Sequence, residues 1–436
     1  MCRSLVTSLS VAVLITACNA VAAAEKGWQQ TSALLTPRTG AGVIEVNGVI
    51  YAIGGVDGRE FLSTSEFSAI QQDGSLAPWR DSGRLNEARG FFGVAAYNGF
   101  IYAVGGGNGP SGHHLLRSVE RAAIRRDGSL GTWQREAQSL TFPRRCAKVV
   151  ALGNDLYAIG GFGGTLFDSV ERAHVNADGS LGPWKLLTDK LTMPRYIHAE
   201  AIVNGRLYVL GGHAEQGGMG EAGVEYADVR NGALGHWQAS VPMQEGRYGL
   251  AAVSHAGYLY AMGGMNGASF SDGIASNHVS ADGALGVWGK AGALPTPLAD
   301  FGAVVYGDRL YIVGGTSPRG YFNDVFMARI GADGQLMAGG SGVQQSPPAP
   351  VNRVELPNYG VVLQALDGGT YIYLQIDTGH GREWLAAADA DIAAGDRVRY
   401  SDGIWMRDFF SKYLQRRFDA IRFVGNLEKV TSQNRD

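Results

Sequence analysis

The chain has few cysteines, and this scarcity excludes a fold held together by disulfides. Only Cys2, Cys18 and Cys146 occur in 436 residues, and the first two lie close to the N-terminus. A disulfide framework needs an even set of cysteines at recurring spacings. We therefore expect stability to come from strand packing and not from covalent cross-links, even in an oxidising compartment.

A charge excess of one sign is also lacking. The 37 basic and 40 acidic residues give a formal net charge of −3. A general nucleic-acid-binding protein presents a basic surface excess. The balance therefore argues against nucleic acid as the partner.

Long apolar runs are absent except near the N-terminus, where residues 5–17 form a stretch too short for a confident membrane span. Residues 1–24 predict a secretory signal peptide, with Arg3 as a minimal positive start and Ala22-Ala23-Ala24 as the small residues before the cleavage point. The predicted mature protein therefore begins near residue 25 and is exported.

A second interpretation of the N-terminus stays open. Ile15-Thr16-Ala17-Cys18 resembles the bacterial lipoprotein box, in which Cys18 is lipidated and becomes the mature N-terminus. Both interpretations predict export in a Gram-negative cell. The protein is periplasmic in the first case and anchored to the outer membrane in the second, and only lipidation at Cys18 makes the membrane a partner.

Glycine is abundant, and it recurs as six Gly-Gly pairs at nearly constant spacing. Successive pairs are separated by 51, 55, 51, 52 and 51 residues. The pairs are Gly54-Gly55, Gly105-Gly106, Gly160-Gly161, Gly211-Gly212, Gly263-Gly264 and Gly314-Gly315. A period near fifty with short strands indicates a propeller or an array.

Each pair belongs to a unit with the same further marks. A tyrosine lies three residues upstream, a tight turn such as Asn47-Gly48 precedes it, and an Asp-Gly or Asn-Gly turn follows about twenty residues later. Asn-Gly accepts the positive φ angles of a type I′ hairpin turn, so residues 43–46 and 49–53 are predicted as paired strands. Double glycine permits close approach to a neighbouring backbone. Each unit is therefore predicted to be one four-stranded blade.

The tryptophans indicate how the ring closes. Five units carry a tryptophan six residues after the second turn, at Trp79, Trp133, Trp184, Trp237 and Trp288, whereas the sixth unit has Gly339 there. Trp28 stands 26 residues before Gly54, as Trp79 stands 26 before Gly105. We expect the strand around Trp28 to complete the last blade, which removes an open sheet edge.

The Gly-Gly, Tyr and Trp spacing resembles the kelch repeat, and six copies resemble a six-bladed kelch β-propeller. The resemblance covers about residues 28–336 and defines a predicted propeller domain at 25–338 in an all-β chain. A propeller of this kind implies no single function, because function resides in sites grafted on folds.

Composition changes after Met337. Residues 339–357 are Gly-rich and then Pro-rich, which predicts a linker. Residues 358–430 are predicted to form a second small domain. Strands are expected at 359–366, 371–376, 383–387, 396–400 and 418–424. Five short strands in so short a segment indicate a small β-barrel.

This segment resembles the small domain of NrfJ-type proteins, which are found beside bacterial cytochrome and redox systems. The matching marks are Asp377-Thr378-Gly379, Glu383-Trp384-Leu385-Ala386, Gly395-Asp396-Arg397-Val398, Met406-Arg407-Asp408-Phe409, and Ser411-Lys412 through Phe418-Asp419-Ala420-Ile421. The resemblance implies an OB-like barrel. Nucleic-acid binding by such a barrel needs a basic groove with stacking aromatics, and export favours a solvated basic face instead.

The candidate ligand-binding residues form a ring of arginines. Arg38, Arg89, Arg144, Arg195 and Arg247 each stand sixteen residues before a Gly-Gly pair, and Leu298 takes the sixth position. Convergent guanidinium groups favour an anionic ligand. The structural alternative is that each arginine ties down a loop, with Glu66, Glu120, Glu171 and Glu225 as partners. Recurrence in five blades favours the structural role.

A second, variable ring lies two residues past each arginine position and could line the channel. Its members are Gly40, Phe91, Cys146, Ile197, Gly249 and Asp300. If exposed near basic side chains, Cys146 would have a lowered thiol pKa, but a small buried residue is the favoured interpretation. His113-His114, His213 and Glu215 lack the spacing of a metal motif, so no metal and no cofactor is expected.

Three functions compete at this point. The favoured one is an exported binding or scaffold protein of the bacterial envelope, with an envelope protein or a small anionic ligand as partner and a link to a redox or cytochrome system through the C-terminal domain. No catalytic constellation stands out. The alternative is a periplasmic sugar-acid enzyme similar to sialic acid mutarotases, with Glu45, Glu200 and the arginine ring available. A copper radical oxidase ranks last, because Cys146 is the only thiol in the propeller and no ordered set of histidines accompanies it.

Overall fold

The structure is a computed structural model of the whole chain. It describes residues 27–214, 219–267, 269–337, 356–367, 371–388, 392–400, 403–411, 414–424 and 427–430. The predicted signal peptide, Cys18 and nearly all of the predicted linker lie outside these residues. Within them the chain is built from strands, and the one helical element is a single 3₁₀ turn, η1 (Pro110–Gly112).

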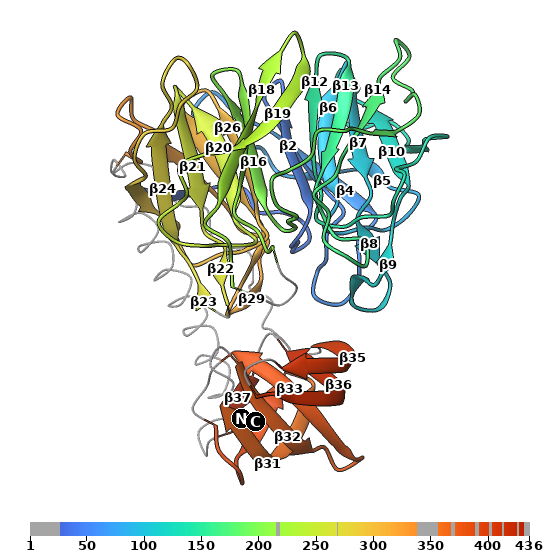
Figure 1. The fold of residues 1–436 in the computed structure, drawn as a ribbon, viewed down its shortest axis with the longest axis vertical. Coiled ribbons are helices and arrows are strands. Elements are labelled where there is room, and N and C mark those ends of the chain that lie inside the picture. The colour runs from blue at the N-terminus through green and yellow to red at the C-terminus, as the bar shows by residue number, and fades with distance from the viewer. Residues whose placement is uncertain are drawn as a thin grey trace, which may run out of the picture. The chain divides into compact units, whose positions relative to one another are not determined.

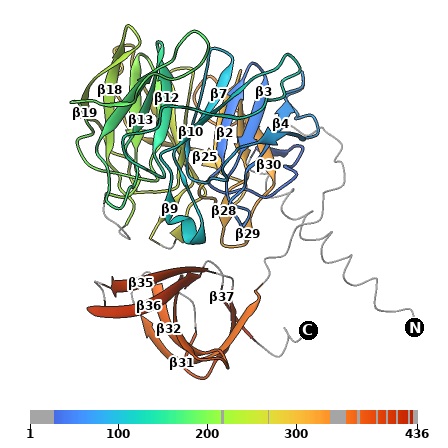
Figure 2. The same ribbon diagram turned by 90° about the vertical axis from the view of Figure 1, so that its right-hand side faces the viewer.

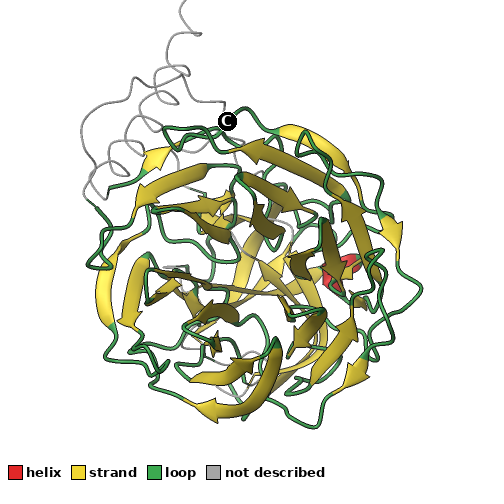
Figure 3. Cartoon of the chain, turned by 90° about the horizontal axis from the view of Figure 1, so that it is seen from above, coloured by secondary structure: helices red, strands yellow, loops and turns green. Residues whose placement is uncertain are grey.

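Six four-stranded antiparallel sheets stand side by side around one axis, as Figure 1 and the view along the axis in Figure 3 show. Blade one consists of β2 (Gly42–Val46), β3 (Val49–Ile53), β4 (Thr64–Ala69) and β5 (Arg80–Arg84), and blade two of β6 (Gly93–Tyr97), β7 (Phe100–Val104), β10 (Val119–Ala123) and β11 (Gln134–Arg135). Blade three consists of β12 (Lys148–Leu152), β13 (Asp155–Ile159), β14 (Val170–His174) and β15 (Lys185–Leu186), and blade four of β16 (Ala199–Val203), β17 (Arg206–Leu210), β18 (Val224–Arg230) and β19 (Ala233–Ala239). Blade five consists of β20 (Ala251–His255), β21 (Tyr258–Met262), β24 (Gly273–His278) and β25 (Gly289–Ala293), and blade six of β26 (Gly302–Tyr306), β27 (Arg309–Val313), β30 (Val325–Arg329) and β1 (Gln29–Gln30). The prediction of a six-bladed propeller is confirmed.

Three blades extend the connection between their second and third strands with a two-stranded ribbon. The ribbons are β8 (Gly107–Asn108) with β9 (His114–Leu115), β22 (Met265–Asn266) with β23 (Ser269–Phe270), and β28 (Thr316–Ser317) with β29 (Gly320–Tyr321). In an antiparallel blade these connections share one face with the links from each blade to the next. We call this face, which carries both kinds of connection, the loop face.

The N-terminal segment closes the ring as predicted. Gln29 and Gln30 of β1 pair with Met327 and Phe326 of β30, so the last sheet combines the first and last strands of the propeller. Trp28 is 1% exposed, and its indole Nε1 donates a hydrogen bond of 2.8 Å to the Ala293 carbonyl. The sheet edge that an incomplete sixth blade would expose is therefore covered.

The Gly-Gly pairs touch the next blade through their backbone. Gly54 and Gly55 both have positive φ, at 56° and 95°. A Cβ on Gly54 would lie 2.5 Å from the carbonyl oxygen of Arg89, and equivalent contacts of 2.4–2.8 Å recur at Gly105, Gly160, Gly211, Gly263 and Gly314. A larger residue would both strain the backbone and collide with the neighbouring blade.

Blade-to-blade packing forms the core. Each apolar cluster combines side chains of adjacent sheets; one of them, for example, joins Tyr51 and Ile53 of β3 to Ile101 and Ala103 of β7. The hydroxyl of Tyr51 donates to the Gly128 carbonyl at 2.7 Å, and Tyr102 and Tyr311 bond the turns at Gly179 and Gly74 in the same way. These tyrosines therefore fasten their blades to the Asp-Gly turn of a neighbour, whereas the buried hydroxyl of Tyr260 in blade five has no hydrogen-bond partner among the described residues.

The second compact unit is a seven-stranded sheet, strongly curved in Figure 2. Its strands are β31 (Asn358–Asp367), β32 (Tyr371–Asp377), β33 (Arg382–Ala388), β34 (Arg397–Tyr400), β35 (Gly403–Ser411), β36 (Arg416–Val424) and β37 (Leu427–Lys429), in the order β35-β36-β33-β32-β31-β34-β37. The sequence analysis missed β35 and β37. Val362, Leu374, Ile376 and Leu385 form the centre of its core.

Candidate functional site

The five arginines of the predicted ring lie inside the blades and not on a surface. Arg38, Arg89, Arg144 and Arg195 are at most 1% exposed, and Arg247 is 9% exposed. In each, Nη1 donates to the carbonyl of the first glycine of the Gly-Gly pair, at 2.8–3.4 Å, and to a carbonyl at the start of the third strand. These bonds hold together the loop connections of one blade.

Four of the arginines also meet a buried glutamate of the third strand. The pairs are Arg38 with Glu66, Arg89 with Glu120, Arg144 with Glu171 and Arg195 with Glu225, and all eight side chains are at most 1% exposed. The second carboxylate oxygen accepts a backbone N–H three residues before the arginine, as from Thr141 to Glu171 at 2.6 Å. Each glutamate thus bridges the arginine and the incoming loop.

This geometry favours the structural role of the arginines. Burial lowers the pKa of Arg89, Arg144 and Arg195 and the nearby glutamates oppose that effect, as expected for a buried ion pair. In blades one to four Nη1 of each arginine already has protein acceptors and Nη2 meets a glutamate, whereas Nε of Arg38, Arg144 and Arg195 is buried without a partner among the described residues. Ligand binding by the five side chains stays a prediction, and Arg247 is the member with the most solvent access.

The variable ring lies on the propeller axis. All six members have left-handed backbone, with φ of 52–62° from Gly40 through Phe91, Cys146, Ile197 and Gly249 to Asp300. Their amides reach around the axis: Phe91 N donates to Gly40 O at 2.7 Å, and bonds of 2.6–2.9 Å join the Cys146, Gly249, Asp300 and Gly40 amides to the preceding blade. The requirement for this hydrogen-bonded ring explains positive φ at Ile197, where a β-branched residue is strained.

Together with neighbours from every blade, this ring lines a cavity of about 70 Å³, as expected from the sequence. Its polar lining is asymmetric. Lys148 lies 3.7 Å from the Glu200 carboxylate, and His198, which is 1% exposed, has no partner for either ring nitrogen in the described part of the chain. Burial raises the pKa of Asp300 to about 6 and holds that of His198 well below its usual range. The axial cavity is therefore lined by a neutral imidazole, the Asp300 carboxyl group and Lys148, whose ammonium group contacts Glu200.

Cys146 is a buried thiol, the interpretation that the sequence analysis favoured. It is 8% exposed, and burial raises its pKa to about 12 in spite of Arg145 and Lys148. The local positive charge does not overcome the cost of placing a thiolate in a desolvated site. Cys146 is not an activated nucleophile in this geometry.

An arc of aromatic rings on the loop face was missed by the sequence analysis. Arg145 stacks over Phe162 at 5.3 Å, Phe162 packs on Tyr196 at 5.7 Å, and His213 lies between Tyr196 at 5.4 Å and Tyr248 at 3.8 Å. These residues come from blades three to five, directly before the axial ring or after the Gly-Gly pair. The signal was present in the sequence, because each stands one residue past a repeat mark.

Two of the histidines considered for a metal site, His114 and His213, have protein partners for their Nδ1 atoms. His114 Nδ1 lies 2.7 Å from Asn108 Oδ1, and His213 Nδ1 lies 3.3 Å from the Met219 carbonyl. Glu215 lies outside the described residues. Within the ranges described above, no group of three His, Cys, Asp or Glu side chains is arranged to hold a metal ion. No helix in the described part of the chain is long and apolar enough to cross a membrane.

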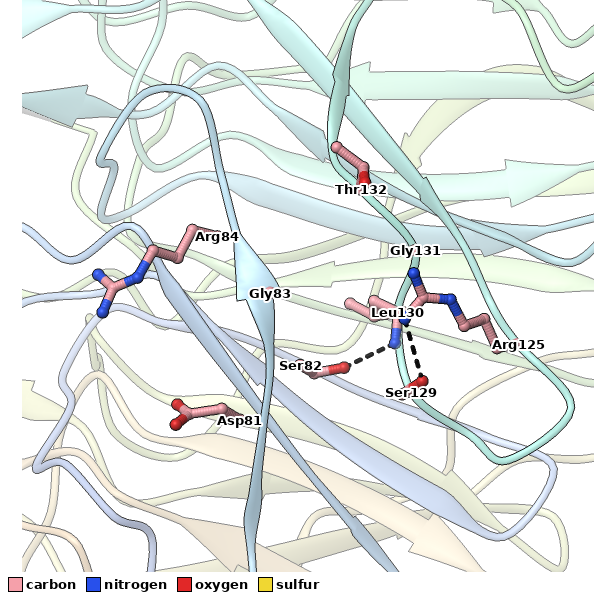
Figure 4. A pocket seen from close by; sticks show the side chains of 9 residues that line it. All are labelled: Asp81, Ser82, Gly83, Arg84, Arg125, Ser129, Leu130, Gly131 and Thr132. Carbon is pink, nitrogen blue, oxygen red and sulfur yellow. Dashed lines mark hydrogen bonds between the residues drawn. The ribbon is translucent and has the colours of Figure 1, made fainter.

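A shallow groove of about 240 Å³ lies at the outer edge of blades one and two (Figure 4). Ser82 of β5 accepts a 2.7 Å bond from the Leu130 amide across this groove, and Arg125 reaches Ser129 at 3.5 Å. Its lining is mainly backbone and turn residues. The groove shows how the outer strand of one blade is tied to the turn of the next.

The repeat geometry defines the class of protein as a kelch-type six-bladed propeller. The family described as Kelch motif matches residues 37–66 and 143–172, which hold the arginine–glutamate pairs of blades one and three. The chain therefore carries kelch motifs on a propeller. The same marks that predicted the fold are those that the structure uses to join blades.

The curated proteins to which this chain is similar include kelch-like proteins. Beta-scruin of Limulus polyphemus is 25% identical over 62% of this chain and 24% of its own length, and Kelch-like protein 35 of Mus musculus is 28% identical over 62% and 42%. Kelch-like protein 15 of Danio rerio is 27% identical over 53% and 39%. The chain thus spans less than half the length of these curated relatives.

A solved structure, titled Structure of YjhT, shows the fold alone. It superposes with a TM-score of 0.59 at 15% identity, and the match covers 70% of this chain and 99% of the other. The covered share corresponds to the size of the propeller.

Proposed function

We propose that this protein is an exported scaffold of the bacterial envelope whose kelch propeller binds a protein partner through its loop face. The observation that carries the proposal is the contrast between the axis and that face. The axial cavity of about 70 Å³ is far below the roughly 300–1,000 Å³ of ordinary small-molecule sites. The loop face instead presents exposed apolar side chains in several blades in addition to the aromatic arc.

Five large apolar residues of the loop face are well exposed. They are Leu35, Phe142, Met219, Val241 and Tyr321, each between 41% and 56% exposed. All lie in connections between second and third strands or between blades. Exposed apolar and aromatic groups on adaptable loops are typical of protein-binding surfaces.

Export and the redox link belong to the proposal as well. Export rests on the composition of residues 1–24, and the redox link rests on the resemblance of residues 358–430 to NrfJ-type proteins. We infer that the C-terminal sheet closes into a small barrel. Its support is that β35 lies at one end of the strand order and β34 lies next to β37 at the other end, although only two residues separate β34 from β35 in sequence. This unit would supply a second contact site.

The sugar-acid enzyme is not favoured. Its acid and its arginines would have to face a channel ligand, but Glu45 accepts the Gly48 amide at 2.7 Å and Glu200 lies beside Lys148. The arginines nearest the axis in blades one to four are buried in ion pairs. No described pair of acid and arginine lies ready for substrate in the axial cavity.

The test is site-directed cross-linking in envelope extract, with variants that each carry one photoreactive residue. Phe142 and Tyr321 sample the loop face, and Val287, which is 87% exposed in a connection of the opposite face, is the matched control. We expect one discrete cross-linked protein from the loop-face positions and none from position 287. Equal products from both faces, or none from either, would refute a loop-face partner.

A further inference from the structure

Blades one to four contain an internal template for binding a carboxylate. In blade two, Glu120 Oε1 accepts from Arg89 Nη2 at 2.8 Å, while Oε2 accepts from the Asn86 amide at 2.7 Å. The same two donors serve Glu66 and Glu171, and in blade four the Thr192 amide donates to Glu225 while Arg195 forms an ion pair with it. The arginine and the N–H three residues before it therefore form a fixed pair of donors, one for each carboxylate oxygen.

Blade six has lost all three components together. Leu298 replaces the arginine, and Phe326, which pairs with Ile312 as Glu66 pairs with Ala52, replaces the glutamate. The residue three before Leu298 is Pro295, which has no N–H to donate. Replacement of a buried ion pair by apolar groups is tolerated when no polar partner is left behind. Blade six shows a complete replacement of this kind.

Blade five has lost only the carboxylate. Arg247 is retained, the residue three before it is Gln244, which has an N–H, and Ala275 takes the glutamate's place in register with Ala261. Among the described residues, the Gln244 amide has no acceptor. Arg247 Nη2 reaches Glu245 at 3.3 Å, and Glu245 is 70% exposed. Blade five thus keeps both hydrogen-bond donors for a carboxylate, although its third strand has no glutamate to accept from them.

The surroundings of Ala275 are positive and open to solvent. Lys290 pairs with Ala275 across β24 and β25, so the two side chains share one face of the sheet. Arg247 is 9% exposed, against at most 1% for the other four arginines. Glu245 does not block a second carboxylate, because in blade two Glu87 lies 3.7 Å from Arg89 while Glu120 binds the same Nη2 at 2.8 Å.

We propose that blade five binds a carboxylate group of an external ligand at the position that the strand glutamate occupies in blades one to four. Arg247 Nη2 holds one carboxylate oxygen, the Gln244 N–H holds the other, and Lys290 adds attraction. The carboxylate belongs either to a free small acid or to an acidic side chain of a protein partner. The second source rests on the proposed function; the first does not.

The first experiment measures the melting temperature of the exported chain in sodium acetate and in sodium chloride at equal ionic strength. Acetate should raise the melting temperature above the chloride value by on the order of 1–3 °C, because it binds the folded state alone. Ala275→Glu installs the missing carboxylate, so it should stabilise the protein in chloride and abolish the acetate effect. Arg247→Met should abolish the effect, and Glu245→Gln should retain it.

Leu186→Glu is the matched control for the added charge. Leu186 pairs with Glu171 on the outer strand of blade three and is 46% exposed, so a glutamate there meets no unpaired donor set. This variant should keep the full acetate effect. Equal melting temperatures in acetate and chloride for the unmodified chain, or an undiminished acetate effect in Arg247→Met, would overturn the proposal.

The second experiment separates the two sources of the carboxylate. If a partner protein supplies it, Ala275→Glu and Arg247→Met should each weaken that partner's binding at least tenfold, while Leu186→Glu leaves it unchanged. If a free acid is the ligand, partner binding is unaffected but the acetate effect persists. A partner that binds all variants equally, with no acetate effect in any of them, would refute the carboxylate site and leave the scaffold function standing.

Discussion

The buried pair of Arg144 and Glu171 offers a quantitative test of how the blades are held. Both side chains are 0% exposed and their nearest charged atoms are 2.5 Å apart. Glu171 also accepts the Thr141 amide at 2.6 Å, and Arg144 donates to the Gly160 carbonyl at 2.9 Å. We perturb the pair with Glu171→Met, with Arg144→Leu and with both changes together.

Each single change leaves an unpaired buried charge, so each should lower the free energy of unfolding by about 3–5 kcal/mol. The double variant has no stranded charge, although Gly160 loses a donor and the Thr141 amide loses its acceptor, each at a cost of about 1–3 kcal/mol. Its loss should therefore be smaller than the sum of the single losses by about 2–3 kcal/mol. Blade six, with Leu298 and Phe326, is the natural precedent for the double change.

The assay is urea unfolding of residues 25–436, followed by tryptophan fluorescence. Lys190 and Asp168 form the control pair in the same blade; their atoms are 2.5 Å apart, but the side chains are 61% and 34% exposed. Asp168→Asn should cost at most about 1 kcal/mol, because water screens that pair. Strict additivity of the two buried changes, or a cost for Glu171→Met no larger than that of Asp168→Asn, would refute the reasoning.

Three further predictions concern the axis and the closure. Burial raises the pKa of Asp300 to about 6 from 3.8, so the free energy of unfolding should fall by up to about 3 kcal/mol as the pH rises from 3.8 to 6. Chemical unfolding of Asp300→Asn should show no such pH dependence in this range. Trp28→Ala should cost about 3–5 kcal/mol in the same unfolding assay, since it removes a fully buried side chain from the seam between first and last strands; an unchanged midpoint would contradict closure by β1. Cys146 should resist iodoacetamide in the folded protein and react on unfolding, as followed by mass spectrometry, because its pKa is about 12; rapid labelling of the native thiol would show that it is accessible.

Most of the propeller fold was predictable from short sequence motifs that repeat along the chain. Asn47-Gly48 predicted a tight turn, and Gly54-Gly55 indicated backbone with positive φ. Each motif alone is weak evidence, but equivalent positions recur in six units at a nearly constant period. Trp28 revealed the closure because its distance to Gly54 matched the repeat. The C-terminal strands were less predictable, and β35 was missed because its mixture of charged and aromatic residues lacks clear alternation.

The position of the candidate site was predictable from the sequence, and the structural role of the arginines was the interpretation that the sequence favoured. The arginine and axial rings were found by counting from repeat marks, and so were the glutamate partners of four arginines. The direction of the Cys146 pKa depended on burial, which local sequence cannot supply. The aromatic arc depended on which connections of different blades meet, since Tyr196 and Tyr248 are far apart in the chain but both touch His213.

The sequence by itself determined the number of blades, the turn positions and the strand that closes the ring, because turn chemistry and period are local properties that repeat. Only the tertiary structure decided which arginines are paired with a buried glutamate and which hydrogen-bond donors are left without a carboxylate. Arg144 and Arg247 stand at the same offset from their glycines, but Glu171 faces one and Ala275 the other. Pairing across a blade joins residues that are distant in sequence, and burial then fixes whether such a pair stabilises the fold or binds a ligand.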